Sequence, residues 1–459
     1  MTAPKLKAPR GTFDVLGPDA AVRSTVEAKA CAILEGAGYE RIETPAFEAT
    51  ELFARGVGAS TDIVQKEMYT FDDGAGRSLT LRPEGTAPVC RAYVEHGMHK
   101  RRQPVKLWYL SSFFRHERAQ AGRYREFWQV GAEALGSEDP AVDAESIGLL
   151  RALLDELGVA PVRLRLSSLG SPDARASYRE QLQLHLRAHE GMLSEDVRAR
   201  IELNPLRAFD SDHPGTRQAL ASAPLLRDFL APEDAAHFAE VRALLEAARI
   251  SYEIDPTLVR GLDYYTRTVF ELTSERLGAQ SGVGGGGRYD GLVEQLGGPA
   301  TAGMGWAAGV ERMLLAGSAP AAPPPPLDLF IAFEAPGAGG GGRRGQALGA
   351  GQRSEVGGAG GLAGAEVEGI DGAAHARART RAHAFALLID ARAAGLVAQM
   401  ELGPRSLKNQ LSHANALGAR YVAILGPDGT VLKDMAAGQQ ETIATDTVIH
   451  AVLRGRRDL

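Results

Sequence analysis

The chain has 459 residues, of which 44% are hydrophobic and 24% are charged, and its formal net charge is -6. These proportions are typical of a globular protein with two or three domains. A nucleic-acid partner would have to be bound by local basic patches, because the whole molecule repels phosphate. The two cysteines, Cys31 and Cys90, have no CxxC partner, which excludes a disulfide framework and a cysteine-based zinc site and indicates a reducing cytoplasm. No apolar stretch is long enough for a membrane span.

The first part of the chain predicts a helix followed by an antiparallel hairpin. Apolar residues recur at helical spacing over 18–37, where glycines end the stretch. Residues 106–114 and 126–135 are aromatic-rich runs of strand length on either side of the basic segment RHERAQAGRYR, which predicts a hairpin with a long loop. Residues 139–157 begin with Asp-Pro, which is typical of an N-cap and a first helical turn, so we expect another helix there.

The middle of the chain changes character twice. Residues 162–170 predict a further strand. The segment 171–250 is rich in Ala, Leu, Arg and Glu at helical spacing and has few β-branched residues, so we predict a helical insertion. Strand-like sequence resumes at Ser251, and a glycine-rich turn followed by a helix over 303–316 completes the first predicted unit.

The C-terminal part predicts a separate domain. PAAPPPP at 320–326 is typical of a stiff linker, within a boundary segment that we place at 318–326. Beyond it, alternating strand-like and helix-like stretches over 327–459 predict a small α/β domain with a largely parallel sheet. Between its first strand and first helix, residues 336–374 are crowded with Gly and Ala and predict a disordered segment. This segment is either a true insertion or a stretch in which the reading frame is altered.

A basic and aromatic constellation surrounds the loop of the predicted hairpin. Arg115, Glu117 and Arg123 lie in the loop, and Phe127 lies in the second strand. A guanidinium group can bind a phosphate group through two parallel hydrogen bonds, and an aromatic ring can stack on a base. The pattern is therefore suited to a nucleotide. The residues leave open the alternative of an exposed hairpin whose charges bind nothing.

Two further stretches are candidates for the walls of a pocket. LVRGLDYYT at 258–266 places an arginine, an aspartate and two tyrosines close together, although a β-turn with packed tyrosines is an alternative. SGVGGGGRYDGL at 281–292 contains the spacing GxGxxG without the required strand before it and helix after it, so we do not expect a Rossmann cofactor. Its glycines would instead let the backbone approach a ligand closely.

Seven stretches in order resemble class II aminoacyl-tRNA synthetases, and among them the histidyl family. They are PRGTFD (9–14), the helix–strand–Pro45 unit, LRPEGTAP (81–88), FRHERAQAGRYREFWQVGAE (114–133), LVRGLDYYTRTVFE (258–271), GGRYDGL (286–292) and GVERM (309–313). The resemblance implies an α+β catalytic domain with an antiparallel sheet over 1–170 and 251–317, the helical insertion over 171–250, and an anticodon-binding α/β domain over 327–459. It also implies a homodimer built around Pro45.

The resemblance further assigns roles to single residues. For ATP it implies Arg115 at the α-phosphate, Glu117 at the adenine amino group, Phe127 stacked on adenine, and Arg123 with Arg312 at the terminal phosphates. For histidine it implies Glu84, Thr86 and Gln129 at the α-amino group, Glu133 and Tyr265 at the imidazole, and Tyr264 and Tyr289 completing the pocket. Catalysis is implied for Arg115 and Arg260 at the α-phosphate, and contacts with tRNA for Arg118, Gln120, Arg405, Lys408 and Asn409.

The implied reaction has two steps. The carboxylate of L-histidine attacks the α-phosphate of ATP and releases pyrophosphate, and a terminal ribose hydroxyl of tRNA(His) then takes the histidyl group. Mg²⁺ would bridge the phosphates, and no permanent cofactor or resident metal is implied. Two alternatives are a catalytically inactive paralogue that regulates histidine biosynthesis and a class II synthetase for another amino acid. The intact RGLDYYT stretch and C-terminal domain argue against the first, and Glu133 with the tandem tyrosines argues against the second.

Overall fold

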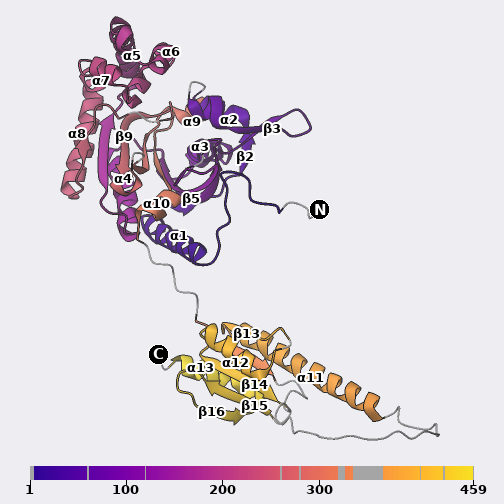
Figure 1. Cartoon of the computed structure of the whole chain (residues 1–459). Helices are drawn as coiled ribbons and strands as arrows, with labels where there is room; N and C mark the ends of the chain where they lie inside the picture. Colours follow the sequence, from indigo (N-terminus) through magenta and orange to yellow (C-terminus); the bar gives the residue numbers. More distant parts are fainter. Residues whose placement is uncertain are drawn as a thin grey trace, which may run out of the picture. The chain divides into compact units, whose positions relative to one another are not determined.

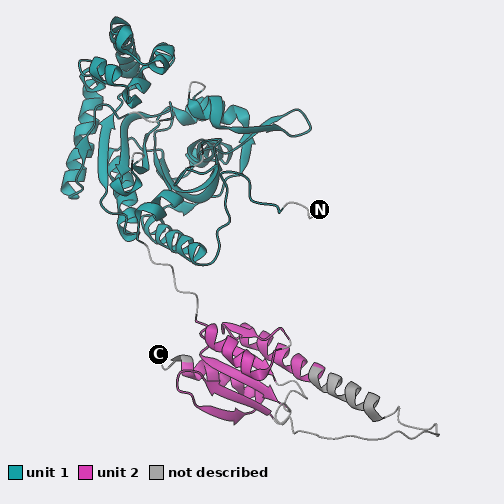
Figure 2. Ribbon diagram, in the orientation of Figure 1, with its two compact units in different colours: residues 1–322 teal, residues 323–459 magenta. Residues whose placement is uncertain are grey.

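The chain forms two compact units, residues 1–322 and 323–459 (Figure 2). The computed structural model describes residues 5–58, 61–118, 120–258, 261–278, 281–318, 326–333, 365–403, 405–426 and 429–457, with the backbone alone at 365–377 and 456–457. The division between the units falls inside the predicted linker 318–326, most of which lies outside the described residues. Within the described part of the chain, no helix combines the length and the apolarity that crossing a bilayer requires.

An eight-stranded sheet forms the framework of the first unit (Figure 1). In spatial order its strands are β1 (Glu40–Arg41), β5 (Val105–Phe114), β6 (Glu126–Leu135), β11 (Gly303–Gly309), β10 (Gly282–Arg288), β9 (Thr266–Thr273), β7 (Arg163–Ser168) and β8 (Glu253–Ile254). The six long strands pair antiparallel with their neighbours, and only the two short strands at the edges pair in parallel. The predicted antiparallel sheet is therefore confirmed, and so is the hairpin of β5 and β6.

Two elements at the centre of this sheet differ from the prediction. The predicted glycine-rich turn is strand β10, and the first half of the helix predicted over 303–316 is strand β11, so helix α10 (Val310–Ala316) begins only afterwards. Both strands lie between antiparallel partners, and a Cβ added to Gly286 would come 1.9 Å from the carbonyl oxygen of Gly305. Glycine and alanine carry little intrinsic preference for a strand, so the prediction was wrong where pairing with distant strands decides the structure.

Two hydrophobic cores cover the two faces of the sheet. Helices α1 (Pro18–Gly36), α4 (Pro140–Glu156) and α10 contribute to one core, with Trp108 and Trp306 of the sheet at its centre. Helix α3 (Thr86–Glu95) packs on the opposite face, where Tyr109 and Phe113 point because side chains alternate along β5. The predicted N-cap of α4 is confirmed, since the side chain of Asp139 accepts a hydrogen bond from the backbone N–H of Ala141 at 2.9 Å.

The chain between β7 and β8 is helical. Its α-helices are α5 (Pro172–Ala188), α6 (Glu195–Arg200), α7 (Pro214–Leu220) and α8 (Pro232–Ala247). In α5 the buried residues Tyr178, Leu182 and Leu186 recur every four positions, as one apolar face of a helix requires. Helix α8 packs against α4, and this contact joins the helical segment to the sheet.

A smaller sheet stands beside the large one in the first unit. Its strands are β2 (Phe47–Ala49), β4 (Ser78–Leu81) and β3 (Tyr69–Asp72) in that order, and helix α2 (Thr50–Gly56) follows β2. On this sheet Phe47 and Phe71 meet edge to face with their ring centroids 6.1 Å apart. Both rings are exposed, by 49% and 43%, so the small sheet carries an uncovered apolar surface.

The second unit is an α/β domain on a five-stranded sheet (Figure 1). Its strands lie in the order β13 (Ala398–Met400), β12 (Leu329–Phe333), β14 (Tyr421–Gly426), β15 (Gly429–Asp434) and β16 (Gln440–Ile443), with helices α11 (Ala365–Ala393), α12 (Leu407–Ala416) and α13 (Val448–Arg457). The first three strands are parallel, as predicted, whereas β15 and β16 add an antiparallel hairpin that the sequence analysis missed.

Helix α11 begins at Ala365, before the start at residue 375 that the sequence predicted. The last part of the segment predicted to be disordered is therefore helical, and its alanines and charged residues favour a helix. Residues 336–364 of that segment lie outside the described residues.

Candidate active site

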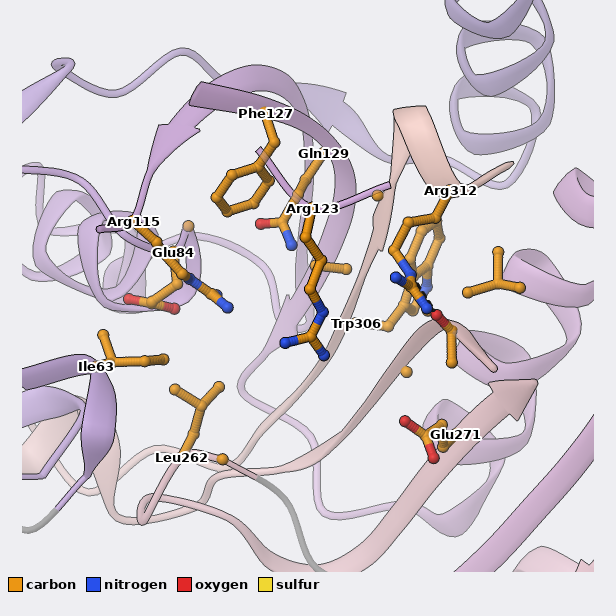
Figure 3. Close-up of a pocket in the computed structure, with 18 of the residues that line it drawn as sticks. Ile63, Glu84, Arg115, Arg123, Phe127, Gln129, Leu262, Glu271, Trp306 and Arg312 are labelled. Atoms are coloured by element: carbon orange, nitrogen blue, oxygen red, sulfur yellow. Dashed lines mark hydrogen bonds between the residues drawn. The ribbon is translucent and has the colours of Figure 1, made fainter. Parts of the chain in front are cut away.

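A cavity of about 680 Å³ opens on the face of the large sheet that carries α3 (Figure 3). Strands β5, β6, β9, β10 and β11 contribute residues to it, together with the β5–β6 loop and α10. The predicted site residues that line it are Glu84, Thr86, Arg115, Glu117, Arg123, Phe127, Gln129, Tyr264, Tyr265 and Arg312. Residues from stretches far apart in the sequence thus meet in one cavity.

One end of the cavity, which we call the inner end, gathers hydrogen-bond acceptors. The carboxylate of Glu84 accepts hydrogen bonds from the backbone N–H groups of Thr86 at 2.8 Å and Ala87 at 3.0 Å, and from the Tyr264 hydroxyl at 3.4 Å. Burial raises the pKa of Glu84, and the backbone N–H groups at the start of α3 oppose that shift. The side-chain Oε1 of Gln129 is buried and has no hydrogen-bond partner among the described residues. An acceptor left in this state is suited to a ligand with N–H donors.

Glu133 on β6 lies behind the wall of the inner end and is fully buried. The Thr86 hydroxyl donates to its Oε1 at 2.8 Å, and the Tyr289 hydroxyl donates to its Oε2 at 2.5 Å. Burial is the largest cause that raises the pKa of Glu133 to about 8. A Cβ added to Gly305 would lie 1.7 Å from Oε2, so the glycine of β11 makes room for this carboxyl group.

The rings of Tyr109, Tyr264 and Tyr265 line the inner end, whereas Tyr289, also predicted for the pocket, is buried behind them and does not line the cavity. The rings of Tyr264 and Tyr265 have centroids 4.8 Å apart, and those of Tyr264 and Tyr289 are 5.8 Å apart. The ring of Tyr109 reaches the same end because Gly131 faces it, and a Cβ there would come 2.3 Å from the Tyr109 hydroxyl. The tyrosines of the RGLDYYT stretch are therefore packed and also line the cavity.

The other end of the cavity, the outer end, gathers positive charge. Arg115 donates from Nε to the carbonyl of Pro83 at 2.9 Å, and its guanidinium carbon lies 5.3 Å from the centroid of the Phe127 ring. Glu117 accepts a hydrogen bond from Arg123 at 3.1 Å. Figure 3 shows Arg115, Arg123 and Arg312 around the same space. The loop arginines therefore line a cavity and do not stand on a wholly exposed hairpin. Guanidinium groups gathered in this way are suited to phosphate oxygens.

The sequence analysis missed several cavity residues, namely Tyr109, Tyr124, Arg165, Arg207, Asp210 and Glu271. Arg165 of β7 pairs across the sheet with Glu271 of β9 at 3.1 Å. A charged residue in the middle of the strand RLRLSS was an available signal. Arg207 and Asp210 come from the helical insertion, and nothing in their local sequence indicates that they reach the cavity.

The remaining predicted residues lie elsewhere. Arg118 lines a second hollow of about 310 Å³ together with Arg10 and Arg125, and Gln120 is on the same loop. Arg405, Lys408 and Asn409 belong to the second unit, where Arg405 donates to Glu401 at 3.1 Å. Arg260 lies outside the described residues. Among the residues that are described, no three His, Cys, Asp or Glu side chains are grouped to hold a metal ion.

Comparison with known proteins gives this arrangement a class and a family. A family model described as Histidyl-tRNA synthetase matches residues 11–313. Over 458 residues the chain is 44% identical to the histidine–tRNA ligase of Desulforudis audaxviator, with 98% of this chain and 99% of that protein covered. The solved structure of apo histidyl-tRNA synthetase from S. aureus covers 98% of this chain and 100% of its own, with 32% identity and a TM-score of 0.72.

The antiparallel sheet with its arginine-lined cavity thus defines a class II aminoacyl-tRNA synthetase. Within that class, the chain belongs to the histidyl-tRNA synthetase family. A Bacillus halodurans structure described as an ATP phosphoribosyltransferase regulatory subunit/histidyl-tRNA synthetase is 22% identical, with a TM-score of 0.58 and coverage of 93% of this chain and 99% of its own. That likeness concerns the fold alone.

Proposed function

We propose that the cavity binds L-histidine at its inner end and ATP at its outer end, so that the two ligands react with each other. The activity is that of a histidine–tRNA ligase, as the near full-length relatives at 44% identity show, and it uses ATP to join histidine to tRNA(His). One observation carries the assignment of the two ends. A single cavity is lined by buried acceptors, Glu84 and Oε1 of Gln129, and by three arginines spread across it, of which Arg115 lies beside Glu84 (Figure 3).

The inner end suits histidine group by group. The α-ammonium group would bind between Glu84, Thr86 and the free Oε1 of Gln129. The imidazole would point towards Tyr265 and Glu133, with Tyr264 and Tyr289 around it. In the ligand-free protein the Thr86 hydroxyl donates a hydrogen bond to Oε1 of Glu133. An N–H group of the imidazole ring would replace this hydroxyl as the donor.

The outer end suits ATP. Arg115 would bind the α-phosphate, Phe127 would stack on adenine, and Glu117 would accept a hydrogen bond from the adenine amino group. Arg123 and Arg312 would bind the terminal phosphates. To reach them, Arg123 would give up its hydrogen bond to Glu117. A role for Arg260 at the α-phosphate rests on its sequence motif alone.

The chemistry needs no nucleophilic side chain. A carboxylate oxygen of histidine would form a bond to the α-phosphorus while the bond to the bridging oxygen breaks and pyrophosphate leaves. Negative charge gathers on the phosphate oxygens in this step, and fixed guanidinium groups stabilise it without reorganisation. The ribose hydroxyl of tRNA would then attack the histidyl carbonyl carbon, and AMP would leave.

Mg²⁺ would accompany the nucleotide. This ion keeps several waters and is bound through one or two carboxylates together with substrate phosphates. Glu271 also lines the cavity, where it is ion-paired with Arg165 at 3.1 Å, and it would supply one such carboxylate. The donor set therefore fits a magnesium ion that arrives with ATP, and the ion would neutralise part of the phosphate charge.

The RNA substrate has a proposed contact surface on each unit, taken separately. Arg118 and Gln120 lie on the β5–β6 loop beside the outer end, where the acceptor end of tRNA(His) would approach. Arg405, Lys408 and Asn409 lie at the start of α12 and would contact the anticodon. Removal of the second group should weaken aminoacylation while pyrophosphate exchange is unchanged.

We also propose that two copies associate through the small sheet and that the enzyme acts in the cytoplasm. The exposed rings of Phe47 on β2 and Phe71 on β3, the two outer strands of the small sheet, form an apolar surface close to Pro45. Such a surface is suited to self-association, since a twofold axis presents the same patch to itself. Sedimentation of the protein and of a Phe47→Asp, Phe71→Asp variant tests this directly.

The function is tested by pyrophosphate exchange with each amino acid in turn. Labelled pyrophosphate should enter ATP only when L-histidine is present. Exchange with a different amino acid would overturn the assignment of the inner end. Absence of exchange with every amino acid would instead point to the inactive regulatory paralogue.

A further inference from the structure

Helix α8 of the helical insertion presents two buried polar residues, Asp234 and His237, to the body of the first unit. They are three positions apart and therefore lie on one side of the helix. Neither lines the cavity. Burying a carboxylate and an imidazole costs free energy unless each is bonded, so their partners are informative.

His237 is bonded to a carboxylate of the sheet-covering helix α4. Its Nε2 lies 2.5 Å from Oδ2 of Asp143, which is itself fully buried. Asp143 also accepts a hydrogen bond from Nε of Arg288 at 3.0 Å and from the Thr268 hydroxyl at 3.3 Å. A single buried carboxylate thus joins α8 to strands β9 and β10.

Arg288 carries this link to the histidine site. Its guanidinium group is fully buried and donates to the carbonyls of Ser137 and Asp139, at 3.0 Å each. These bonds fix the chain immediately before Tyr289, whose hydroxyl donates to Glu133. Arg288, the last residue of β10 and the residue before Tyr289, is therefore held by a network that includes His237.

Asp234 makes a parallel link to the other pocket tyrosine. Its carboxylate accepts from Nε of Arg267 at 2.9 Å and from the backbone N–H of Ser171 at 2.7 Å. Arg267 is two residues after Tyr265 and has a φ of +44°, a backbone conformation that needs support in a non-glycine residue. Helix α8 thus supports the chain beside both Tyr265 and Tyr289.

We infer that His237 is a positioning residue for the histidine site, which acts through Asp143 and Arg288 to fix Tyr289 and hence Glu133. The helical insertion is in this way a structural part of amino-acid recognition. The inference rests on the proposed function of the inner end. It concerns the placement of Glu133 only, so it predicts an effect on histidine that is not shared by ATP, whose proposed groups lie at the other end.

The test compares His237→Leu with His237→Gln in pyrophosphate exchange. Leucine removes the bond to Asp143, and the KM for histidine should rise about 10-fold with the KM for ATP unchanged. Glutamine can place an amide N–H where the imidazole Nε2 was, so it should restore most of the affinity. Val241→Ala is the matched control, because Val241 is buried one turn further along α8 and has no polar link.

The outcomes separate a positioning role from a merely structural one. Val241→Ala should lower the melting temperature and leave the KM for histidine unchanged. The inference is overturned if His237→Leu leaves that KM unchanged, or if Val241→Ala raises it as much. If His237→Leu does not fold, His237→Asn replaces it, since its shorter amide does not reach Asp143. Wild-type protein that shows no exchange with histidine would refute the proposed function, whereas wild-type exchange with unaffected variants refutes this inference alone.

Discussion

The two ends of the cavity are built on different physical principles. At the inner end, Glu133 is fully buried and bonded to Thr86 and Tyr289, and glycines make room for its neighbours. At the outer end, the Arg123 side chain is 42% exposed and is held by Glu117. The side chains of the inner end are therefore fixed before a ligand binds. At the outer end, the partly exposed side chain of Arg123 can still change its position.

The difference matches two tasks. A buried polar site rejects a wrong ligand strongly, because any group that fails to pair stays unpaired in a medium of low dielectric constant. Partly exposed arginines cannot select in this way, but they stabilise charge that develops on phosphate oxygens. We therefore expect substitutions at the inner end to change the affinity for histidine and substitutions at the outer end to change the rate of adenylate formation.

The largest expected effect is at the outer end. Arg115→Ala should lower the rate of histidyl-adenylate formation by about 10²- to 10³-fold, the scale of losing one fixed donor to a developing oxyanion. Single-turnover formation of the adenylate measures this rate. The KM for histidine should change less, because Arg115 donates to the Pro83 carbonyl and lies over the Phe127 ring, and no hydrogen bond joins it to Glu84 or Gln129 among the described residues.

Arg163→Ala is the control for this variant. Arg163 also forms an ion pair, with Glu275, but at an exposed position of β7 outside the cavity. Its replacement should leave adenylate formation unchanged. A rate close to wild type in Arg115→Ala would show that the outer end does not act through this charge.

The next effect concerns the inner end. Glu133→Gln should raise the KM for histidine about 10- to 100-fold, since a buried ligand N–H that loses its acceptor costs about 1–3 kcal/mol. The KM for ATP should stay the same, and both constants come from pyrophosphate exchange. Glu138→Gln, at an exposed position just beyond the same strand, is the control. Equal losses for histidine and ATP would mean that Glu133 supports the fold and does not read the ligand.

Folding stability should also depend on Glu133. Burial raises its pKa from 4.5 to about 8, so between these values the folded protein holds a proton that the unfolded chain releases. Stability from this group is therefore present below pH 4.5 and is lost as the pH rises to about 8. The free energy of unfolding of wild type and of Glu133→Gln can be measured with denaturant across this pH range. As the pH rises, the stability of wild type should fall relative to the variant, by at most about 1.4 kcal/mol per pH unit. A constant difference would mean that Glu133 is already ionised in the folded protein.

The same contrast explains what the sequence could predict. The β5–β6 hairpin and the Asp139 cap depend on neighbours in the chain, and both were predicted. Strands β10 and β11 were not, because their glycines acquire a structure only from strands far away in sequence. Periodicity cannot reveal such pairing.

The site shows a similar division. Arg115 and Glu84 were predicted because they stand in recognisable motifs, and the structure brings them to one cavity. Arg165 and Glu271 were missed because their approach depends on the register of β7 against β9. Glu133 lies behind the cavity wall because Gly305, on the neighbouring strand β11, makes room for its carboxyl group. No local sequence pattern around Glu133 predicts this.

The smallest expected effect comes from Gln129, an inner acceptor without a hydrogen-bond partner in the described part of the chain. Oε1 of Gln129 is buried without a partner among the described residues, and an unpaired buried acceptor destabilises a fold by about 1–3 kcal/mol. Gln129→Met keeps the length of the side chain and removes the acceptor. It should therefore stabilise the ligand-free protein, by about 1 kcal/mol if the amide N–H groups of Gln129 are solvated in the cavity. Histidine should in turn stabilise the variant less than it stabilises wild type. Thermal unfolding with and without histidine measures both changes, and a variant that is less stable than wild type without ligand would contradict the view that this acceptor is reserved for the substrate.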